Sequence, residues 1–300
     1  MVSFRQLRFL VSLADELHFS RAADTCNVSQ PTLSSGLKQL EDSLGIPLAE
    51  RTKRSVILTP IGEKIAEQAR SVLAKVADIE RLAAHHTGPL HGDLHLGAIP
   101  TLGPFLIPKA LPALRRAYPE LRLYLREELT DSLLEGLFSG RLDVILIALP
   151  FEIGESAEIE FLFEDSYQLA TSYSDPLASQ KRIRGSDLNG RSLMLLEKGH
   201  CLQRHALSAF PDCVVPQDER FAATSLGTLI SMVEEGLGIT LLPQLAIDAG
   251  VAKGHAIEMR PIEGACPRQV AIAWRRTSPY AGDFVTLAAA LRKTRAELGA

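Results

Sequence analysis

The cysteines are the residues of this chain best suited to chemistry, and there are four: Cys26, Cys201, Cys213 and Cys266. They lie far apart and form no Cys-x-x-Cys pair, so the sequence predicts neither a disulfide scaffold nor a zinc site. Cys201 follows Gly199-His200 at the expected start of a helix over residues 203–210. A helix amino terminus and a neighbouring histidine both favour thiolate over thiol, which predicts a reactive sulfur. The alternative is a small buried apolar side chain.

A second group of polar residues follows Ser29, which we expect to cap a helix with Pro31 in its first turn and Gly45 at its end. Leucines spaced three or four residues apart give this helix a buried stripe: Leu33, Leu37, Leu40 and Leu44. Its other face carries side chains that can hydrogen-bond to base edges or phosphates: Gln30, Thr32, Ser34, Ser35 and Lys38. This pattern predicts a recognition helix, with ordinary helical packing as the alternative.

Two shorter helices are expected before it, the first with an apolar face from Leu7 to Leu17 and the second capped by Ser20. After it, Arg51, Lys53 and Arg54 form a basic hairpin tip that leads into a β-prone run. Such a wing can lie along a phosphate backbone. Residues 1–59 therefore read as a winged helix-turn-helix DNA-binding domain.

Thr59-Pro60 opens a helix that we expect to run to about residue 86. Apolar residues recur along it at heptad spacing: Ile65, Ala69, Val72, Val76 and Ile79. Such a seam can pair two chains, so residues 60–88 are predicted to be a linker and dimerisation helix. The alternative is a surface helix that packs on its own domain.

Beyond Gly88-Pro89, apolar strand-like runs alternate with helical segments, which is the pattern of an α/β sheet. The run over residues 144–149 is continuously apolar, as expected of a strand covered on both faces. Helices are predicted over residues 108–118, 132–139 and 283–298. Residues 89–300 are therefore predicted to be an α/β domain.

The composition fits a water-soluble protein of two or three compact units. The net charge of −4 disfavours a protein that coats nucleic acid, and the acidic excess lies after residue 90. No apolar run is long enough to span a bilayer, and the opening residues do not resemble a signal peptide. We expect a cytoplasmic protein that needs no metal or other cofactor and is not an enzyme.

Several motifs together resemble the signature of LysR-type transcriptional regulators: Ala22-Ala23, residues 28–34, Leu44-Gly45, Glu50-Arg51 and residues 58–62. The resemblance implies DNA contacts by Ser29, Gln30, Pro31, Thr32, Ser34, Ser35 and Lys38, with Arg51, Lys53 and Arg54 nearer the backbone. It also implies a regulatory domain like the periplasmic binding proteins, with lobe I over 92–161 and 267–300 and lobe II over 162–266. Ala49 stands where the family usually has phenylalanine.

Within the family, residues 98–104, Thr130, residues 199–202, residues 223–226 and residues 238–243 are similar to the OxyR group of hydrogen-peroxide sensors. That resemblance implies that Cys201 reacts with hydrogen peroxide. It implies that Thr101, Thr130, His200 and Arg275 hold the peroxide molecule.

The chain departs from this group at the resolving cysteine, because Phe210 stands at the usual position and the nearest cysteine is Cys213. Arg204 stands where an acidic residue is common. If residues 202–210 are helical, the sulfurs of Cys201 and Cys213 start roughly 12 to 18 Å apart, so a disulfide needs local unfolding. We hypothesise that this rearrangement is the switch. Cys26 and Cys266 are interpreted as structural.

Three functions remain open at this stage: a peroxide-responsive regulator, a LysR-type regulator that binds a small metabolite between its lobes, and a thiol peroxidase. The peroxidase is disfavoured because it has no use for residues 1–90. For either regulator the expected partners are a double-stranded DNA operator, a second copy in a homodimer or homotetramer, and RNA polymerase. The resemblance implies a transcriptional activator that controls oxidative-stress genes.

Overall fold

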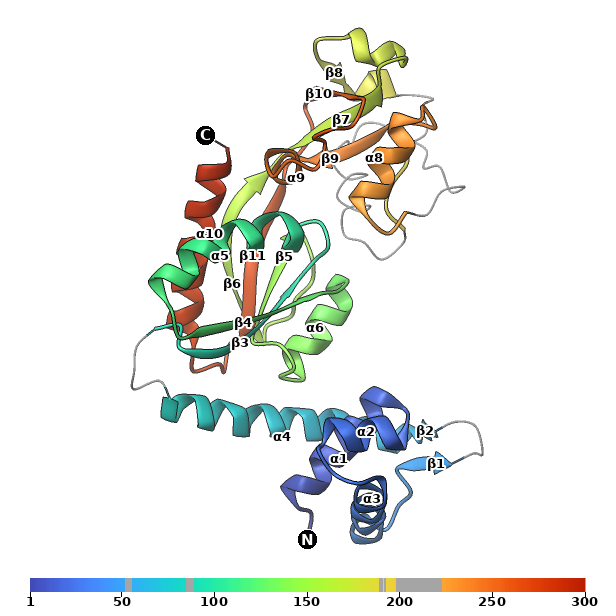
Figure 1. The fold of residues 1–300 in the computed structure, drawn as a ribbon, viewed down its shortest axis with the longest axis vertical. Coiled ribbons are helices and arrows are strands. Elements are labelled where there is room, and N and C mark those ends of the chain that lie inside the picture. Colours follow the sequence, from blue (N-terminus) through green and yellow to red (C-terminus); the bar gives the residue numbers. More distant parts are fainter. Residues whose placement is uncertain (52–55, 85–88, 189–190, 192, 198–222, 300) are drawn as a thin grey trace. The chain divides into compact units, whose positions relative to one another are not determined.

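A computed structural model of the chain describes residues 1–51, 56–84, 89–188, 191, 193–197 and 223–299 (Figure 1). The chain divides into two compact units, which we call the amino-terminal unit (residues 1–86 with 138–141) and the carboxy-terminal unit (residues 87–137 with 142–300). None of the helices in the described residues is both long and apolar enough to cross a membrane. The predicted combination of a helix-turn-helix domain with an α/β domain is confirmed.

The amino-terminal unit begins with three helices, α1 (Phe4–Glu16), α2 (Phe19–Thr25) and α3 (Gln30–Leu44). A short antiparallel hairpin follows, β1 (Ala49–Arg51) with β2 (Val56–Leu58), and then the long helix α4 (Pro60–Ala84). One apolar core joins the three helices, the hairpin and the start of α4: Phe9, Leu10, Leu13, Ala22, Ala23, Leu33, Leu37, Leu40, Leu48, Leu58 and Ala66.

The caps of α3 are as predicted. Ser29 accepts a hydrogen bond from the backbone N–H of Thr32, and Gly45 ends the helix in the left-handed conformation at φ 71°. The predicted buried stripe is right for its first three leucines and wrong for Leu44, which is 37% exposed at the last turn.

The predicted cap of α2 is wrong. His18 is the N-cap, and its Nδ1 accepts a hydrogen bond from the backbone N–H of Arg21 at 3.4 Å. The helix starts at Phe19, which packs against the core, so Ser20 falls inside the first turn.

Helix α4 runs without a break over the described part of residues 60–86, as predicted. The hydroxyl of Thr59 accepts a hydrogen bond from Gly62 N at 3.0 Å and donates one to the carbonyl oxygen of Pro47 at 2.9 Å. Because Thr59 bonds both to the helix and to the chain before the hairpin, it fixes the direction in which α4 leaves the hairpin.

In the carboxy-terminal unit, a five-stranded sheet has the order β4-β3-β5-β11-β6. Its strands are β3 (Gly92–Ala98), β4 (Leu121–Glu127), β5 (Val144–Leu149), β6 (Ala157–Asp165) and β11 (Arg268–Arg275). The first three are parallel, and β11 runs antiparallel to β5 and to β6. The central strand β5 is almost wholly buried, as its apolar run predicts.

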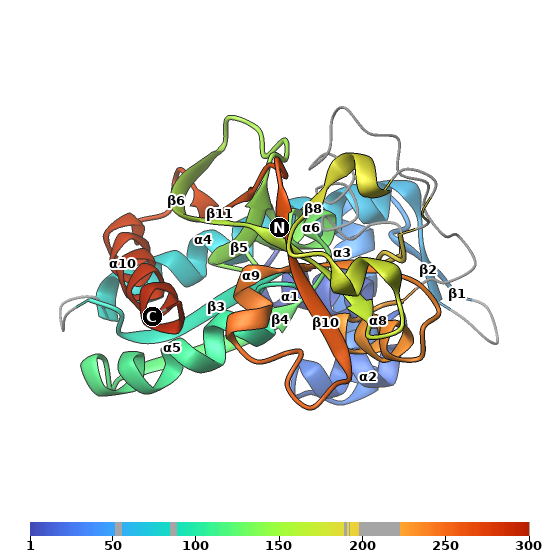
Figure 2. The same ribbon diagram turned by 90° about the horizontal axis from the view of Figure 1, so that it is seen from above.

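Helices cover both faces of this sheet: α5 (Gly103–Ala117), α6 (Thr130–Phe138) and α10 (Ala281–Leu298). A Cβ added at Gly97 would meet Leu133 of α6, whereas the Cβ of Ala98 lies against Gly103 of α5. Successive strand residues point to opposite faces, so α6 and α5 lie on different sides. Helices α5 and α10 pack against each other (Figure 1, Figure 2).

Helix α5 begins at Gly103, five residues before the predicted start at Pro108, and it contains three prolines. Pro104 lies in its first turn, and Pro108 and Pro112 lie in its interior, four residues apart. All three prolines lie on the exposed face. The carbonyl groups that they leave without a partner along the helix can therefore face water.

A smaller sheet has the order β8-β10-β7-β9 and its own apolar core. Its strands are β7 (Tyr167–Ser172), β8 (Ile183–Arg184), β9 (Thr240–Pro243) and β10 (Ile257–Glu263), with helices α8 (Leu226–Glu234) and α9 (Gln244–Asp248) and 3-10 turns at Pro176–Ser179 and Gly185–Leu188. We call the five-stranded part the first lobe and this part the second lobe. The chain leaves the first lobe after Asp165, four residues beyond the predicted point, because β6 stays paired with β11 up to Arg268.

Replacing Gly62 by alanine is expected to destabilise the amino-terminal unit. The added methyl group would come within 2.0 Å of the carbonyl oxygen of Leu48, whose backbone N–H is held by Glu41 at 2.8 Å. Overpacking against a fixed backbone costs about 1 to 3 kcal/mol. The midpoint of urea unfolding measures the loss. Gly282→Ala is the matched control, because nothing lies within 4 Å of the added methyl group in α10. Equal midpoints for the two variants would contradict the close contact.

Candidate functional site

The polar face of α3 is open to solvent. Gln30, Thr32, Ser35 and Lys38 are exposed and Ser34 is half-buried, on the side away from the buried leucines. Ser29 and Pro31 are exposed as well. The Ser29 hydroxyl lies 2.8 Å from that of Thr32, so the cap also orients a side chain of the exposed face. The face that the sequence assigns to DNA is therefore available for contact.

The hairpin that follows is held by Glu41 of α3. Its Oε1 accepts hydrogen bonds from Leu48 N at 2.8 Å and Ala49 N at 3.2 Å, which fixes the start of β1. Arg51 pairs with Val56 in the hairpin ladder. The side chain of Arg51, and Lys53 and Arg54 altogether, lie outside the described residues.

The heptad stripe of α4 divides into two parts. Ile65 packs partly against the core of its own unit and Ala69 is 2% exposed, so the first part of the stripe is covered within one chain. Val72 is 45% exposed and Ile79 is 65% exposed, and Val76 is intermediate. Only the second part leaves apolar surface for another molecule.

Cys201, Cys213 and His200 lie outside the described residues. The residues on either side of 198–222 are adjacent, since Glu197 donates its backbone N–H to the carbonyl oxygen of Ala223 at 2.9 Å. Met194 is tied to Ile239 and Thr240 in the same core. Of the other cysteines, Cys26 packs against the helical core, whereas Cys266 is exposed, contrary to a structural role.

Thr101 is buried beside an arginine that the sequence analysis did not single out. Arg268, at the start of β11, donates from Nη1 to the Thr101 hydroxyl at 2.8 Å and from Nη2 to its carbonyl oxygen at 3.2 Å. Thr101 is 1% exposed and follows the carboxyl end of β3. A hydroxyl that accepts from an arginine keeps its own hydrogen to donate.

The same guanidinium is paired with Asp165 at the end of β6. Arg268 donates from Nε at 3.0 Å and from Nη2 at 2.8 Å to one carboxylate oxygen, and both side chains are 0% exposed. The other carboxylate oxygen accepts from Leu245 N in α9 at 2.8 Å. Strands β6 and β11 connect the two lobes. Through this ion pair, both strands are bonded to the first-lobe loop at Thr101 and to the second-lobe helix α9.

Thr130 lies near this edge of the sheet. It is 1% exposed, and its hydroxyl has no hydrogen-bond partner among the described residues. Glu128 N donates to the carbonyl oxygen of Ala98 at 3.2 Å, so the loops that carry Thr101 and Thr130 leave the sheet side by side. Partial burial raises the pKa of Glu127, whose carboxylate would lie 3.5 Å from a Cβ at Gly103. Two buried hydroxyls thus lie in segments that leave the sheet at this edge, next to the exposed Glu127.

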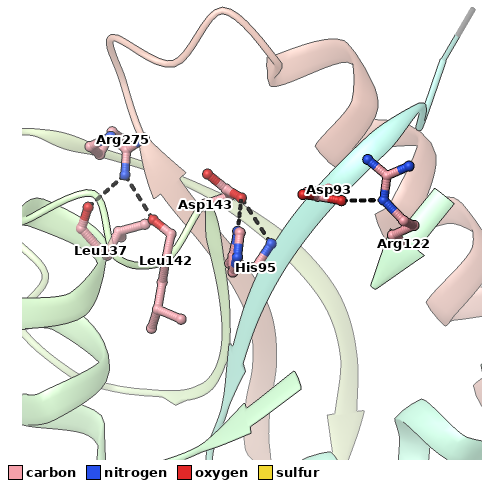
Figure 3. Close-up of polar contacts among 7 residues, drawn as sticks. All are labelled: Asp93, His95, Arg122, Leu137, Leu142, Asp143 and Arg275. Atoms are coloured by element: carbon pink, nitrogen blue, oxygen red, sulfur yellow. Dashed lines mark hydrogen bonds and ion pairs between the residues drawn. The ribbon is translucent and has the colours of Figure 1, made fainter. Parts of the chain in front are cut away.

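Arg275 does not belong to this group. It is at the other end of β11 from Arg268, about 23 Å away along the strand. Its Nη1 donates to the carbonyl oxygens of Leu137 at 2.7 Å and Leu142 at 2.8 Å, beside the His95–Asp143 contact (Figure 3). In this conformation Arg275 and Thr101 cannot hold one peroxide molecule between them, and the expectation for Arg275 needs correction.

A sequence signal for Arg268 does exist. It is a charged residue that opens a mostly apolar strand, and its partner Asp165 closes another strand. Charged residues at such positions are buried only when paired.

Comparisons with known proteins agree over most of the chain. The family described as "Bacterial regulatory helix-turn-helix protein, lysR family" matches residues 4–63, and "LysR substrate binding domain" matches residues 87–294. A "Hydrogen peroxide-inducible genes activator" of Dickeya chrysanthemi is 41% identical over 292 residues, covering 97% of this chain and 95% of the relative.

Two solved structures are similar as well. A full-length OxyR variant from Pseudomonas aeruginosa has a TM-score of 0.80 at 39% identity, covering 97% of this chain and 95% of that one. A hydrogen-peroxide-bound OxyR mutant from Corynebacterium glutamicum has a TM-score of 0.69 at 31% identity, covering 99% and 93%.

Removing the buried arginine is expected to destabilise the carboxy-terminal unit strongly. Arg268→Met leaves the Asp165 carboxylate buried without its charge partner, which costs about 3 to 5 kcal/mol. Urea unfolding measures this loss. The double variant Arg268→Met with Asp165→Asn removes the buried charge and keeps an acceptor for Leu245, so it should recover part of the stability.

The matched control for this experiment is Arg182→Ala. Arg182 pairs with Glu263 at 3.0 Å, but its side chain is 72% exposed, so its loss should cost less than about 1 kcal/mol. A loss for Arg268→Met no larger than for Arg182→Ala would contradict the buried pair.

The structure thus contains a helix with an exposed polar face, a hairpin beside it and a two-lobed α/β unit. The two LysR family models match residues 4–63 and 87–294. The chain belongs to the LysR family of bacterial transcriptional regulators.

Proposed function

We propose that this protein is a cytoplasmic transcriptional activator that senses hydrogen peroxide through Cys201 and responds by changing how a dimer or tetramer holds operator DNA. The buried Thr101–Arg268 contact carries the proposal, because it assembles hydrogen-bond donors at one edge of the first lobe. The Dickeya relative is named a hydrogen peroxide-inducible genes activator, and the Corynebacterium OxyR mutant is hydrogen-peroxide-bound, which supports the same signal here.

The chemistry requires a thiolate and donors. The Cys201 thiolate attacks one peroxide oxygen, the oxygen–oxygen bond breaks, and the sulfur becomes a sulfenic acid while the other oxygen leaves as hydroxide. That hydroxide takes a proton and departs as water. Donors aimed at the leaving oxygen stabilise the charge that develops on it. Thr101, with Arg268 behind it, and Thr130 are assigned this role, in place of Arg275. His200 is assigned to the thiolate.

A disulfide completes the switch. The Cys213 thiol attacks the sulfenic sulfur, and the two cysteines join with loss of water. The described ends of the intervening segment, Glu197 and Ala223, are bonded to each other beside the core of the second lobe, so a change between them would be transmitted to that lobe. A local rearrangement of this kind is a means of resetting the spacing of two DNA-reading helices.

On DNA, α3 is assigned to the major groove through Ser29, Gln30, Pro31, Thr32, Ser34, Ser35 and Lys38. Arg51, Lys53 and Arg54 are assigned to phosphates from the hairpin. Two such helices about one DNA turn apart require a dimer, for which residues 60–88 supply the rod. The domain limits at 59, 88 and 267, with the first lobe crossing moved from 161 to 165, are part of the same proposal. So are the further assembly into a tetramer and contact with RNA polymerase.

Cys201→Ser is expected to abolish the response to peroxide. The experiment is a DNase footprint on the duplex upstream of the protein's own gene, with reduced protein and with protein treated with one equivalent of peroxide. The wild type should change its footprint and Cys201→Ser should keep the reduced pattern. Cys266→Ser is the control, since this exposed thiol has no role in the mechanism. A Cys201→Ser protein that still responds would reject peroxide sensing by this residue.

Two further measurements test the role of Cys213 and the metabolite-binding alternative. Cys213→Ser should stop at sulfenic acid, detected by a dimedone adduct, so a normal disulfide count in this variant would reject Cys213 as the resolving cysteine. If no footprint changes with peroxide and a small metabolite changes it instead, the metabolite-binding alternative holds.

Ile79→Glu is expected to weaken dimerisation and, with it, operator binding. Val72 and Ile79 are seven residues apart and so lie on one face of α4, and both are exposed in one chain. Burying a carboxylate between two such faces is costly. Sedimentation equilibrium should show a larger fraction of monomer at a given concentration. Glu67→Lys is the control because Glu67 is exposed on another face of the same helix. An unchanged dimer in Ile79→Glu would place the interface elsewhere.

A further inference from the structure

An open groove of about 470 Å³ lies between the start of α1 and the exposed face of α3. From α3 its lining includes Thr32, Ser35 and Gln39, and from α1 it includes Arg5. Thr32 and Ser35 belong to the face assigned to DNA, whereas no DNA role has been assigned to α1. The groove therefore extends the DNA-facing surface onto a second helix.

Arg5 is the charged residue of this groove, and no carboxylate lines it. The guanidinium carbon of Arg5 lies 5.3 Å from the centre of the Phe9 ring, one helical turn along α1. Cation–π stacking restricts the arginine without using its N–H donors. The groove thus presents a fixed positive charge beside short hydroxyl side chains.

The position of the ring depends on Gly36 in α3. Phe9 is 4% exposed, and a Cβ at residue 36 would come within 2.6 Å of its ring. Only a residue without a side chain lets α1 approach α3 this closely. The spacing between Arg5 and the hydroxyl of Ser35 is therefore set by the helix pair and not by a loop.

Ser3 and Gln6, which also line the groove, are occupied with each other. Gln6 Oε1 accepts from Ser3 N at 2.8 Å, and the Ser3 hydroxyl accepts from Gln6 N at 3.3 Å. This capping box fixes the first turn of α1, so Arg5 projects from a rigid element. A planar guanidinium held in this way matches the oxygens of a phosphate, which it can bind with two parallel hydrogen bonds.

We infer that this groove binds a phosphate of the DNA backbone, with Arg5 as the residue that contacts it. The inference rests on the proposed function, in which α3 enters the major groove. A helix in the DNA major groove lies between the two phosphate backbones that border this groove. Arg5 of α1 is held beside the DNA-facing side of α3. The contact positions α3 and carries no sequence preference, because phosphates are the same at every base pair.

The test compares Arg5→Gln with Arg8→Gln in fluorescence anisotropy on two 40-base-pair duplexes, one from upstream of the protein's own gene and one of scrambled sequence. Arg8 has the same charge, is exposed on the same helix and does not line the groove. Arg5→Gln should weaken binding about tenfold per protomer on both duplexes. The slope of log affinity against log salt should fall by about 0.9 per protomer. Arg5→Lys, which keeps the charge without the planar fork, should keep the slope and recover part of the affinity.

The outcomes separate the two proposals. If the wild type does not prefer its own duplex, the proposed function fails, whatever Arg5 does. If the wild type binds with preference and Arg5→Gln matches Arg8→Gln in affinity and salt slope, the phosphate contact is rejected. A loss confined to one of the two duplexes would also overturn it, because it would indicate a base contact. Circular dichroism melting of the variants shows whether a loss comes from unfolding.

Discussion

The buried pair of Arg268 and Asp165 is the constraint on which the carboxy-terminal unit depends. Both side chains are fully removed from solvent, and such charges are tolerated only when each is paired and hydrogen-bonded. Asp165 meets this condition with the guanidinium and with Leu245 N, and Arg268 adds two contacts to Thr101. One pair therefore ties β6 and β11 to the first-lobe loop and to α9. A displacement of Thr101 cannot occur without disturbing the strands that connect the lobes.

A second tie lies on the same side of the lobe connection. Arg295 of α10 pairs with Asp248 of α9 at 2.9 Å, and its guanidinium lies 5.6 Å from the centre of the Phe163 ring on β6. Both charged side chains are mostly buried, so the contact is screened less than a surface pair. The two ties fix α9 to the first lobe near its beginning and near its end. A conformational change that begins in the second lobe beyond α9 must therefore either leave both of these contacts in place or break one of them.

The sequence predicts best those structural features that depend on residues within a few positions of one another. The caps Ser29 and Gly45, the opening of α4 at Pro60 and the buried strand β5 follow from residue types within a few positions. The cap of α2 is missed because Phe19, held by the core, moves the helix start ahead of Ser20. The contact of Arg268 with Thr101 spans 167 positions, and no local pattern specifies it. Both Arg268 and Arg275 border β11, and only the antiparallel pairing of β11 with β5 decides which of them reaches the carboxyl end of β3.

The two surfaces assigned to DNA and to peroxide differ in how their side chains are held, and this difference fits their proposed tasks. On α3 and α1 the side chains are exposed and fixed by caps and by one stacked ring, so they can meet a hydrated partner without moving the core. At the edge of β3 the hydroxyls are buried, and that of Thr101 is held by a charge that is itself locked in place. A buried donor set costs free energy unless a ligand or a neighbour satisfies it, and Thr130 is not satisfied among the described residues. A small polar molecule that entered there would gain a donor already desolvated, which is the arrangement that a sensor of hydrogen peroxide requires.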